Sequence, residues 1–131
     1  MQLTINGKVR KLVWGTGCFE DVCDRLGVSL VDLDILMAEN ETKTLNEITY
    51  SALRNGADID DEVLDFNYKY FLSWLDNEPQ GTGDNIMKDF LASKYLGKTM
   101  QDYYNDLIAR FEVGEPETKK AVKKKHIASE K

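Results

Sequence analysis

LTINGKVRKLVWGTGCFEDVCDRLGVSL, residues 3–30, contains the change of pattern that decides the fold. Its first half alternates apolar and polar residues around Asn6-Gly7, a dipeptide typical of the turn in a β-hairpin. From Thr16 onward the apolar residues recur every three to four positions, which is the period of a helix. We therefore expect an N-terminal β-hairpin followed by helices.

The register of this hairpin depends on the length of its turn. A two-residue turn pairs Ile5 with Lys8, whereas a three-residue loop pairs Ile5 with Val9. The second pairing places two apolar side chains together and is the better match for a buried face. The apolar run 12–14 predicts that the end of the second strand is covered on both sides, at least one of them by a helix.

The rest of the sequence predicts six helices. The first follows Thr16 and ends at Gly27, because glycine tolerates the left-handed conformation of a helix C-cap. The N-terminal signals of the other five are, in order, Ser29, Thr42 or Thr44, Asp60 or Asp61, Asp84 and Thr99. We expect Asn55-Gly56 to stop the third helix and Gly97 the fifth.

The fourth helix has the strongest apolar pattern. Its stripe consists of Val63, Phe66, Tyr70, Phe71, Trp74 and Leu75. We expect this helix to be the central one of a mainly α (α+β) fold, in which the N-terminal β-hairpin packs on about six helices. The aromatic residues expected to be substantially buried are Trp14, Phe19, Phe66, Phe71 and Trp74.

Charge is distributed unevenly along the 131 residues. Residues 1–114 hold 11 Lys and Arg against 20 Asp and Glu, a net charge of −9, whereas residues 115–131 hold 6 Lys against 3 Glu, a net charge of +3. We expect residues 1–114 to form a single helical domain and residues 115–131, which lack a regular apolar pattern, to form a flexible lysine-rich tail. The acidic domain argues against nucleic-acid binding, which depends on neutralising phosphates.

The apolar runs are too short for a membrane protein. None approaches the roughly 18 uncharged residues of a membrane span, and the N-terminus has no secretory apolar core. These features predict a protein without membrane contact that stays in the cytoplasm.

The residue types needed for common catalytic and metal sites are scarce. The one histidine, His126, lies in the tail, so the domain lacks the base of a His-containing triad and the ligands of a multi-histidine zinc site. Cys18 and Cys23 are interpreted as two buried free thiols rather than as a disulfide or metal clip. The acidic residues of segment 58–65 lack the spacing of a calcium loop and suit a helix N-terminus. We expect no enzymatic activity, no cofactor and no metal site.

Three tyrosines are candidates for contact with a protein partner. Tyr68 lies off the stripe of the fourth expected helix, and the adjacent Tyr103 and Tyr104 of the sixth cannot both point fully inward. Tyrosine suits a hydrated interface, because its ring supplies contact area and its hydroxyl tolerates water. We expect one or more of the three to contact a partner.

Residues 2–77 carry three features in order: a strand–NGK–strand opening at Asn6-Gly7-Lys8, a small and apolar segment at Ser51-Ala52-Leu53, and an acidic helix ending near Trp74-Leu75. In this order the segment resembles the phage tail assembly chaperone family. The resemblance implies a small helical protein of a tailed phage or prophage that acts in the cytoplasm of the bacterial host. It also implies binding to the tape measure protein and assistance to the tail tube protein as it polymerises.

The resemblance transfers no catalytic or binding residue, because the family is not defined by a chemical motif in this segment. A structural head–tail or tail component of a phage and a small protein-binding adaptor domain are the alternative functions. Self-association is compatible with each of them.

Overall fold

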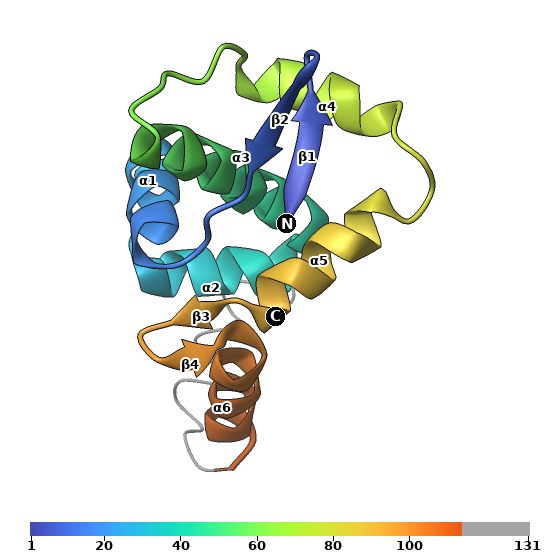
Figure 1. Ribbon diagram of the computed structural model, residues 1–131. Helices are drawn as coiled ribbons and strands as arrows, with labels where there is room; N and C mark the ends of the chain where they lie inside the picture. The colour runs from blue at the N-terminus through green and yellow to red at the C-terminus, as the bar shows by residue number, and fades with distance from the viewer. Residues whose placement is uncertain (114–131) are drawn as a thin grey trace.

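Ten elements of secondary structure form a mainly helical α+β fold in the computed structural model, which describes residues 1–113 and the side chains up to Arg110 (Figure 1). In chain order they are β1 Gln2–Ile5, β2 Lys8–Lys11, α1 Thr16–Leu26, α2 Leu30–Glu39, α3 Glu41–Ile59, α4 Tyr68–Asp76, α5 Thr82–Ala92, β3 Lys94–Tyr95, β4 Lys98–Thr99 and α6 Met100–Val113. Six helices accompany a two-stranded N-terminal hairpin, which confirms the expected fold class. The expected tail, residues 115–131, lies outside the described residues.

A two-residue turn closes the N-terminal hairpin. Asn6 and Gly7 have positive φ angles of 56° and 76°, and Ile5 lies opposite Lys8. The alternative pairing of Ile5 with Val9 is therefore wrong. Val9 is 58% exposed, so the second strand does not supply the apolar partner that the pattern suggested.

In this register a charged residue, Arg10, lies on the inner face of the hairpin. It lies opposite Leu3, is 8% exposed, and donates hydrogen bonds to the backbone oxygen of Ile5 from Nε at 3.1 Å and Nη2 at 2.9 Å. Its guanidinium also pairs with Asp65 at 2.8 Å and lies 5.2 Å from the centroid of the Phe66 ring. A buried arginine is tolerated here because its donors are satisfied.

The central helix is α3 rather than the fourth helix, contrary to expectation. It packs against α1, α2, α4 and β2, and Figure 1 shows it behind the hairpin and above α2. It also continues past Asn55-Gly56 to Ile59, so the expected stop is wrong. Gly56 is instead a point of close approach, because a Cβ atom there would lie 2.3 Å from the carbonyl oxygen of Lys11.

Side-chain caps set the N-termini of four of the six described helices, α2, α3, α4 and α6. Ser29 accepts a hydrogen bond from the backbone N–H of Asp32 at 3.1 Å, Thr99 accepts one from Asp102 at 3.1 Å, and Gly27 adopts a left-handed conformation, as expected. The expected start of α3 at Thr42 or Thr44 is wrong, because Asn40 is the N-cap of that helix.

The fourth helix was expected to have its N-cap at Asp60 or Asp61, but α4 starts at Tyr68 and its N-cap is Asn67, six or seven residues later. The acidic residues before it pair with the basic residues of β2 instead of capping a helix. The pairs are Lys11–Asp60 at 2.9 Å, Lys8–Glu62 at 3.0 Å and Arg10–Asp65 at 2.8 Å. These ion pairs tie the connection between α3 and α4 to the hairpin, and Val63 is 91% exposed on it.

A second small hairpin follows α5, where the sequence predicted helix up to Gly97. The helix α5 runs from Thr82 to Ala92, so it starts two residues before Asp84, its expected cap. After it, β3 and β4 pair through a turn at Leu96-Gly97. Both turn residues have positive φ, 52° and 87°, as in the first hairpin. The spacing of the apolar residues in this segment is that of a helix, so the sequence analysis did not predict the turn.

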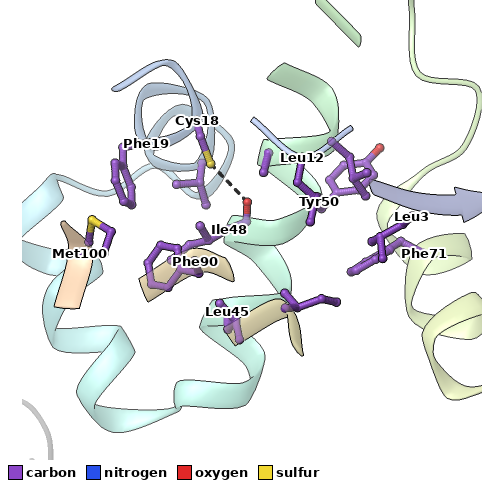
Figure 2. Packing of buried hydrophobic residues seen from close by; sticks show 14 of the residues in the cluster. Leu3, Leu12, Cys18, Phe19, Leu45, Ile48, Tyr50, Phe71, Phe90 and Met100 are labelled. Atoms are coloured by element: carbon purple, nitrogen blue, oxygen red, sulfur yellow. Dashed lines mark hydrogen bonds between the residues drawn. The ribbon is translucent and has the colours of Figure 1, made fainter. Parts of the chain in front are cut away.

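The core lies between α1, α3, α4, α5 and the first hairpin. Figure 2 shows Phe19, Ile48, Phe71 and Phe90 within it, and the expected burial of Phe19 and Phe71 is confirmed. The expectation of substantial burial is met only in part for three other aromatic residues, which are half-buried against this cluster. They are Trp14, Phe66 and Trp74.

Candidate functional site

The three candidate tyrosines do not form one surface. Tyr68 lies on α4, where its ring makes an edge contact with Tyr50 at 5.7 Å between centroids. Tyr103 and Tyr104 lie on α6, with centroids 5.2 Å apart, and α4 and α6 lie at opposite ends of the molecule (Figure 1). All three rings are half-buried, so each is partly occupied by contacts within the chain.

Tyr103 joins α6 to α2 through an acidic residue that the sequence analysis did not single out. Its hydroxyl donates a hydrogen bond to Oδ2 of Asp34 at 2.6 Å. Burial raises the pKa of Asp34, although this hydrogen bond and the positive charge of Arg110 lower it in part. Burial likewise raises the pKa of Tyr103 and of Tyr104. Both tyrosines stay protonated near neutral pH. The hydrogen bond from Tyr103 to Asp34 therefore holds α6 against α2.

Replacing Asp34 with asparagine should stabilise the protein more at pH 7 than at about pH 3.5. The folded-state pKa of Asp34 is raised, so its ionisation costs stability as the pH rises through that value, whereas below the unfolded pKa of about 3.9 the residue is protonated in both states. Urea denaturation at the two pH values measures the difference. A larger gain at low pH would contradict the burial of this carboxyl group.

Tyr103→Phe is the matched control for this junction. It removes the donor to the Asp34 carboxylate and keeps the ring, so it should destabilise the protein by about 1 kcal/mol at pH 7.

The outward side of α2 carries exposed apolar side chains. Seven of the ten residues from Leu30 to Glu39 are apolar and the other three are acidic. Leu33 and Met37 point into the core, whereas Val31 is 68% exposed. Ile35 and Ala38 lie four and seven residues after Val31, on the same side of the helix. We call Val31, Ile35 and Ala38 the α2 face.

Negative charge surrounds the α2 face. Residues 20–41 contain 7 Asp and Glu and a single basic residue, Arg25. That arginine is engaged within the body, because it donates hydrogen bonds to Glu47 at 2.9 Å and to Ser51 at 2.8 Å, and its guanidinium lies 5.0 Å from the centroid of the Tyr50 ring. Carboxylates therefore predominate in the sequence around α2, although the positive charge of Arg110 on α6 also acts on Asp34.

The depression between β2 and α3 is too small for a substrate. Its volume is 30 Å³, far below the roughly 300 to 1,000 Å³ typical of small-molecule sites, and Val9, Leu53 and Leu64 are among the residues that line it. Among the described residues, no group of three His, Cys, Asp or Glu side chains is placed to hold a metal ion. No described helix is both long enough and apolar enough to cross a bilayer.

The two cysteines are free thiols, as expected, but only Cys18 is fully buried. Burial raises the pKa of Cys18, and its Sγ donates a hydrogen bond to the backbone oxygen of Ile48 at 3.3 Å (Figure 2). Cys23 is half-buried, and burial together with the nearby charge of Asp24 raises its pKa. Thiols that remain protonated are poor nucleophiles, so neither position is arranged for covalent catalysis.

Comparison with known proteins gives no match: no family model fits the chain, and neither a curated protein nor a solved structure is significantly similar to it. The candidate site therefore stands on its geometry. The sequence analysis singled out the three tyrosines of this site because of their residue type. The α2 face was missed, although the sequence holds a signal for it in a helix whose only polar residues are acidic.

Proposed function

We propose that this chain is a phage tail assembly chaperone that binds the tape measure protein and assists polymerisation of the tail tube in the bacterial cytoplasm. The observation that carries the proposal is the α2 face, an apolar stripe with Val31 and Ala38 exposed and Ile35 half-buried, on a helix with no basic residue. A helix that is apolar on most sides is normally covered by other protein. Val31 and Ala38 lack such cover among the described residues, which favours a protein partner.

The charge of the chain supports the same function. A chaperone for long apolar helices has to expose apolar surface without aggregating with its own copies. The net charge of −9 on residues 1–114 supplies repulsion between copies. Binding to apolar helices and mutual repulsion are therefore compatible in one small domain.

Light scattering tests this proposal directly. A purified helical segment of the tape measure protein, diluted from denaturant, should aggregate alone and stay soluble with an equimolar amount of the full chain. An unrelated acidic protein of similar size and net charge is the control, and it should leave the scattering unchanged. Equal aggregation with and without the chain would contradict the proposal.

A further inference from the structure

We infer that the connection between α3 and α4 is a salt-sensitive strap, which ion pairs hold against the hairpin and which opens locally when these pairs are screened or removed. We call residues 60–66 the strap. Figure 1 shows this connection running past the N-terminal hairpin from the end of α3 to the start of α4. The inference goes beyond the proposed function and does not depend on it.

Every basic residue of β2 pairs with a carboxylate of the strap. The three pairs are Lys11–Asp60 at 2.9 Å, Lys8–Glu62 at 3.0 Å and Arg10–Asp65 at 2.8 Å. The side chains of the three carboxylates are between 48% and 53% exposed, so water and salt ions reach each pair. Exposed ion pairs are individually weak and are screened by salt. The strap is therefore held by contacts that cost little to break.

The middle of the strap has few other contacts. Its start is tied to α3, because the backbone N–H of Glu62 donates a hydrogen bond to the Ala57 oxygen at 2.8 Å. Its end is tied to Tyr50, whose hydroxyl donates one to the backbone oxygen of Phe66 at 2.9 Å. In the described part of the chain, residues 63–66 make no hydrogen bond from backbone to backbone. Between its two ends the strap is held by charge and by the half-buried Leu64.

The strap forms one wall of the depression between β2 and α3. Glu62 and Leu64 of the strap line this depression together with Val9 and Leu53. Opening would take Leu64 out of this wall and give the apolar lining contact with water. Regions with few buried contacts open at lower free energy than the core around them. Loss of the ion pairs would thus become exposure of apolar surface.

Salt should act on the strap and on the whole domain in opposite directions. Residues 1–114 carry a net charge of −9, so salt weakens a repulsion that opposes the compact state. The same salt weakens the attraction within the three ion pairs, because the Debye length falls to about 3 Å at about 1 M ionic strength. The strap should therefore open at a salt concentration at which the domain stays folded.

Limited proteolysis of the full chain with subtilisin, followed by mass spectrometry, tests the inference. The measured quantity is the initial rate of cleavage within the strap divided by the rate within residues 77–81, the connection between α4 and α5. No ion pair in the described part of the chain involves residues 77–81, so this ratio cancels changes in protease activity and in global unfolding. From about 0.05 M to about 1 M NaCl the ratio should rise about three- to tenfold. A constant ratio would overturn the inference.

Two double variants assign the effect to the ion pairs. Lys8→Gln/Lys11→Gln removes two of the three pairs, so at low salt its ratio should already be near the value that wild type reaches at high salt. Lys88→Gln/Lys94→Gln is the matched control. It removes the same charge from two exposed lysines that form no ion pair in the described part of the chain, and its ratio should equal that of wild type. Equal ratios in the two variants would contradict the strap.

A charge swap separates local opening from general loss of stability. Lys8→Glu places a like charge against Glu62 and should raise the ratio, whereas Lys8→Glu/Glu62→Lys restores an opposite pair and should return the ratio close to that of wild type. Urea denaturation followed by circular dichroism measures the global stability of each variant. Restoration by the swap, with global stability close to wild type throughout, supports the inference. A swap that does not restore the ratio, or a raised ratio found only in globally destabilised variants, would show that the strap opens only with the whole domain and would overturn it.

Discussion

Replacement of Phe90 by alanine should lower the free energy of unfolding by about 3 to 5 kcal/mol. Phe90 is fully buried, and the centroid of its ring lies 5.2 Å from that of Trp14 and 6.2 Å from that of Tyr104. It thus connects α5 to the segment before α1 and to α6. Alanine would leave a cavity that these elements cannot close together. Chemical denaturation followed by circular dichroism measures the loss.

Tyr70→Ala is the matched control for this prediction. Tyr70 is 43% exposed, and its ring contacts Phe66 with centroids 5.7 Å apart. Because it fills no buried space, its removal should cost less than about 1 kcal/mol. Similar losses for the two variants would show that Phe90 is not the core residue described here.

Replacement of Gly56 by alanine should destabilise the protein by about 2 kcal/mol, the second largest effect expected. The added Cβ atom would lie 2.3 Å from the carbonyl oxygen of Lys11, which belongs to backbone and cannot turn aside. The hydrogen bond from Val13 N–H to the Ala52 oxygen, 3.1 Å long, holds the same crossing of chain segments. Overpacking of this kind costs about 1 to 3 kcal/mol and outweighs the gain of up to about 1 kcal/mol from helix propensity.

Gly83→Ala makes the opposite change on another helix. No atom lies within 4 Å of the position where its Cβ would stand, so only the helix propensity of alanine acts. This variant should stabilise the protein by up to about 1 kcal/mol. Thermal melts of both glycine variants test the contrast, and a stabilised Gly56→Ala would contradict the close packing of β2 on α3.

Features controlled by local chemistry were predictable from the sequence. The Asn6-Gly7 turn, the caps at Ser29 and Thr99 and the left-handed Gly27 depend on residues near one another in the chain. Each follows from the conformational preference or hydrogen-bonding groups of a few neighbouring residues. The number and type of the main elements followed from these signals.

Features decided by distant contacts were not predictable. Gly56 reads as a helix stop until β2 is known to cross it. Asp60 reads as a helix cap until Lys11, 49 residues away, is known to pair with it at 2.9 Å. In both cases a tertiary contact overrides the local preference.

The candidate site shows the same division between local and distant information. Tyr103 was singled out by residue type, but its bond to Asp34 depends on how α6 lies against α2. The α2 face needs the fold as well, because only packing shows that Leu33 and Met37 point inward and Val31 outward. Its acidic border, in contrast, was visible in the sequence.

Affinity purification of the tagged full chain from phage-producing cells tests the central claim most directly. Mass spectrometry should identify the tape measure protein as the main partner before tails are complete, and purified mature particles should lack the chain. A chain that stays in the mature particles at a fixed copy number, or that purifies without the tape measure protein, would contradict the account.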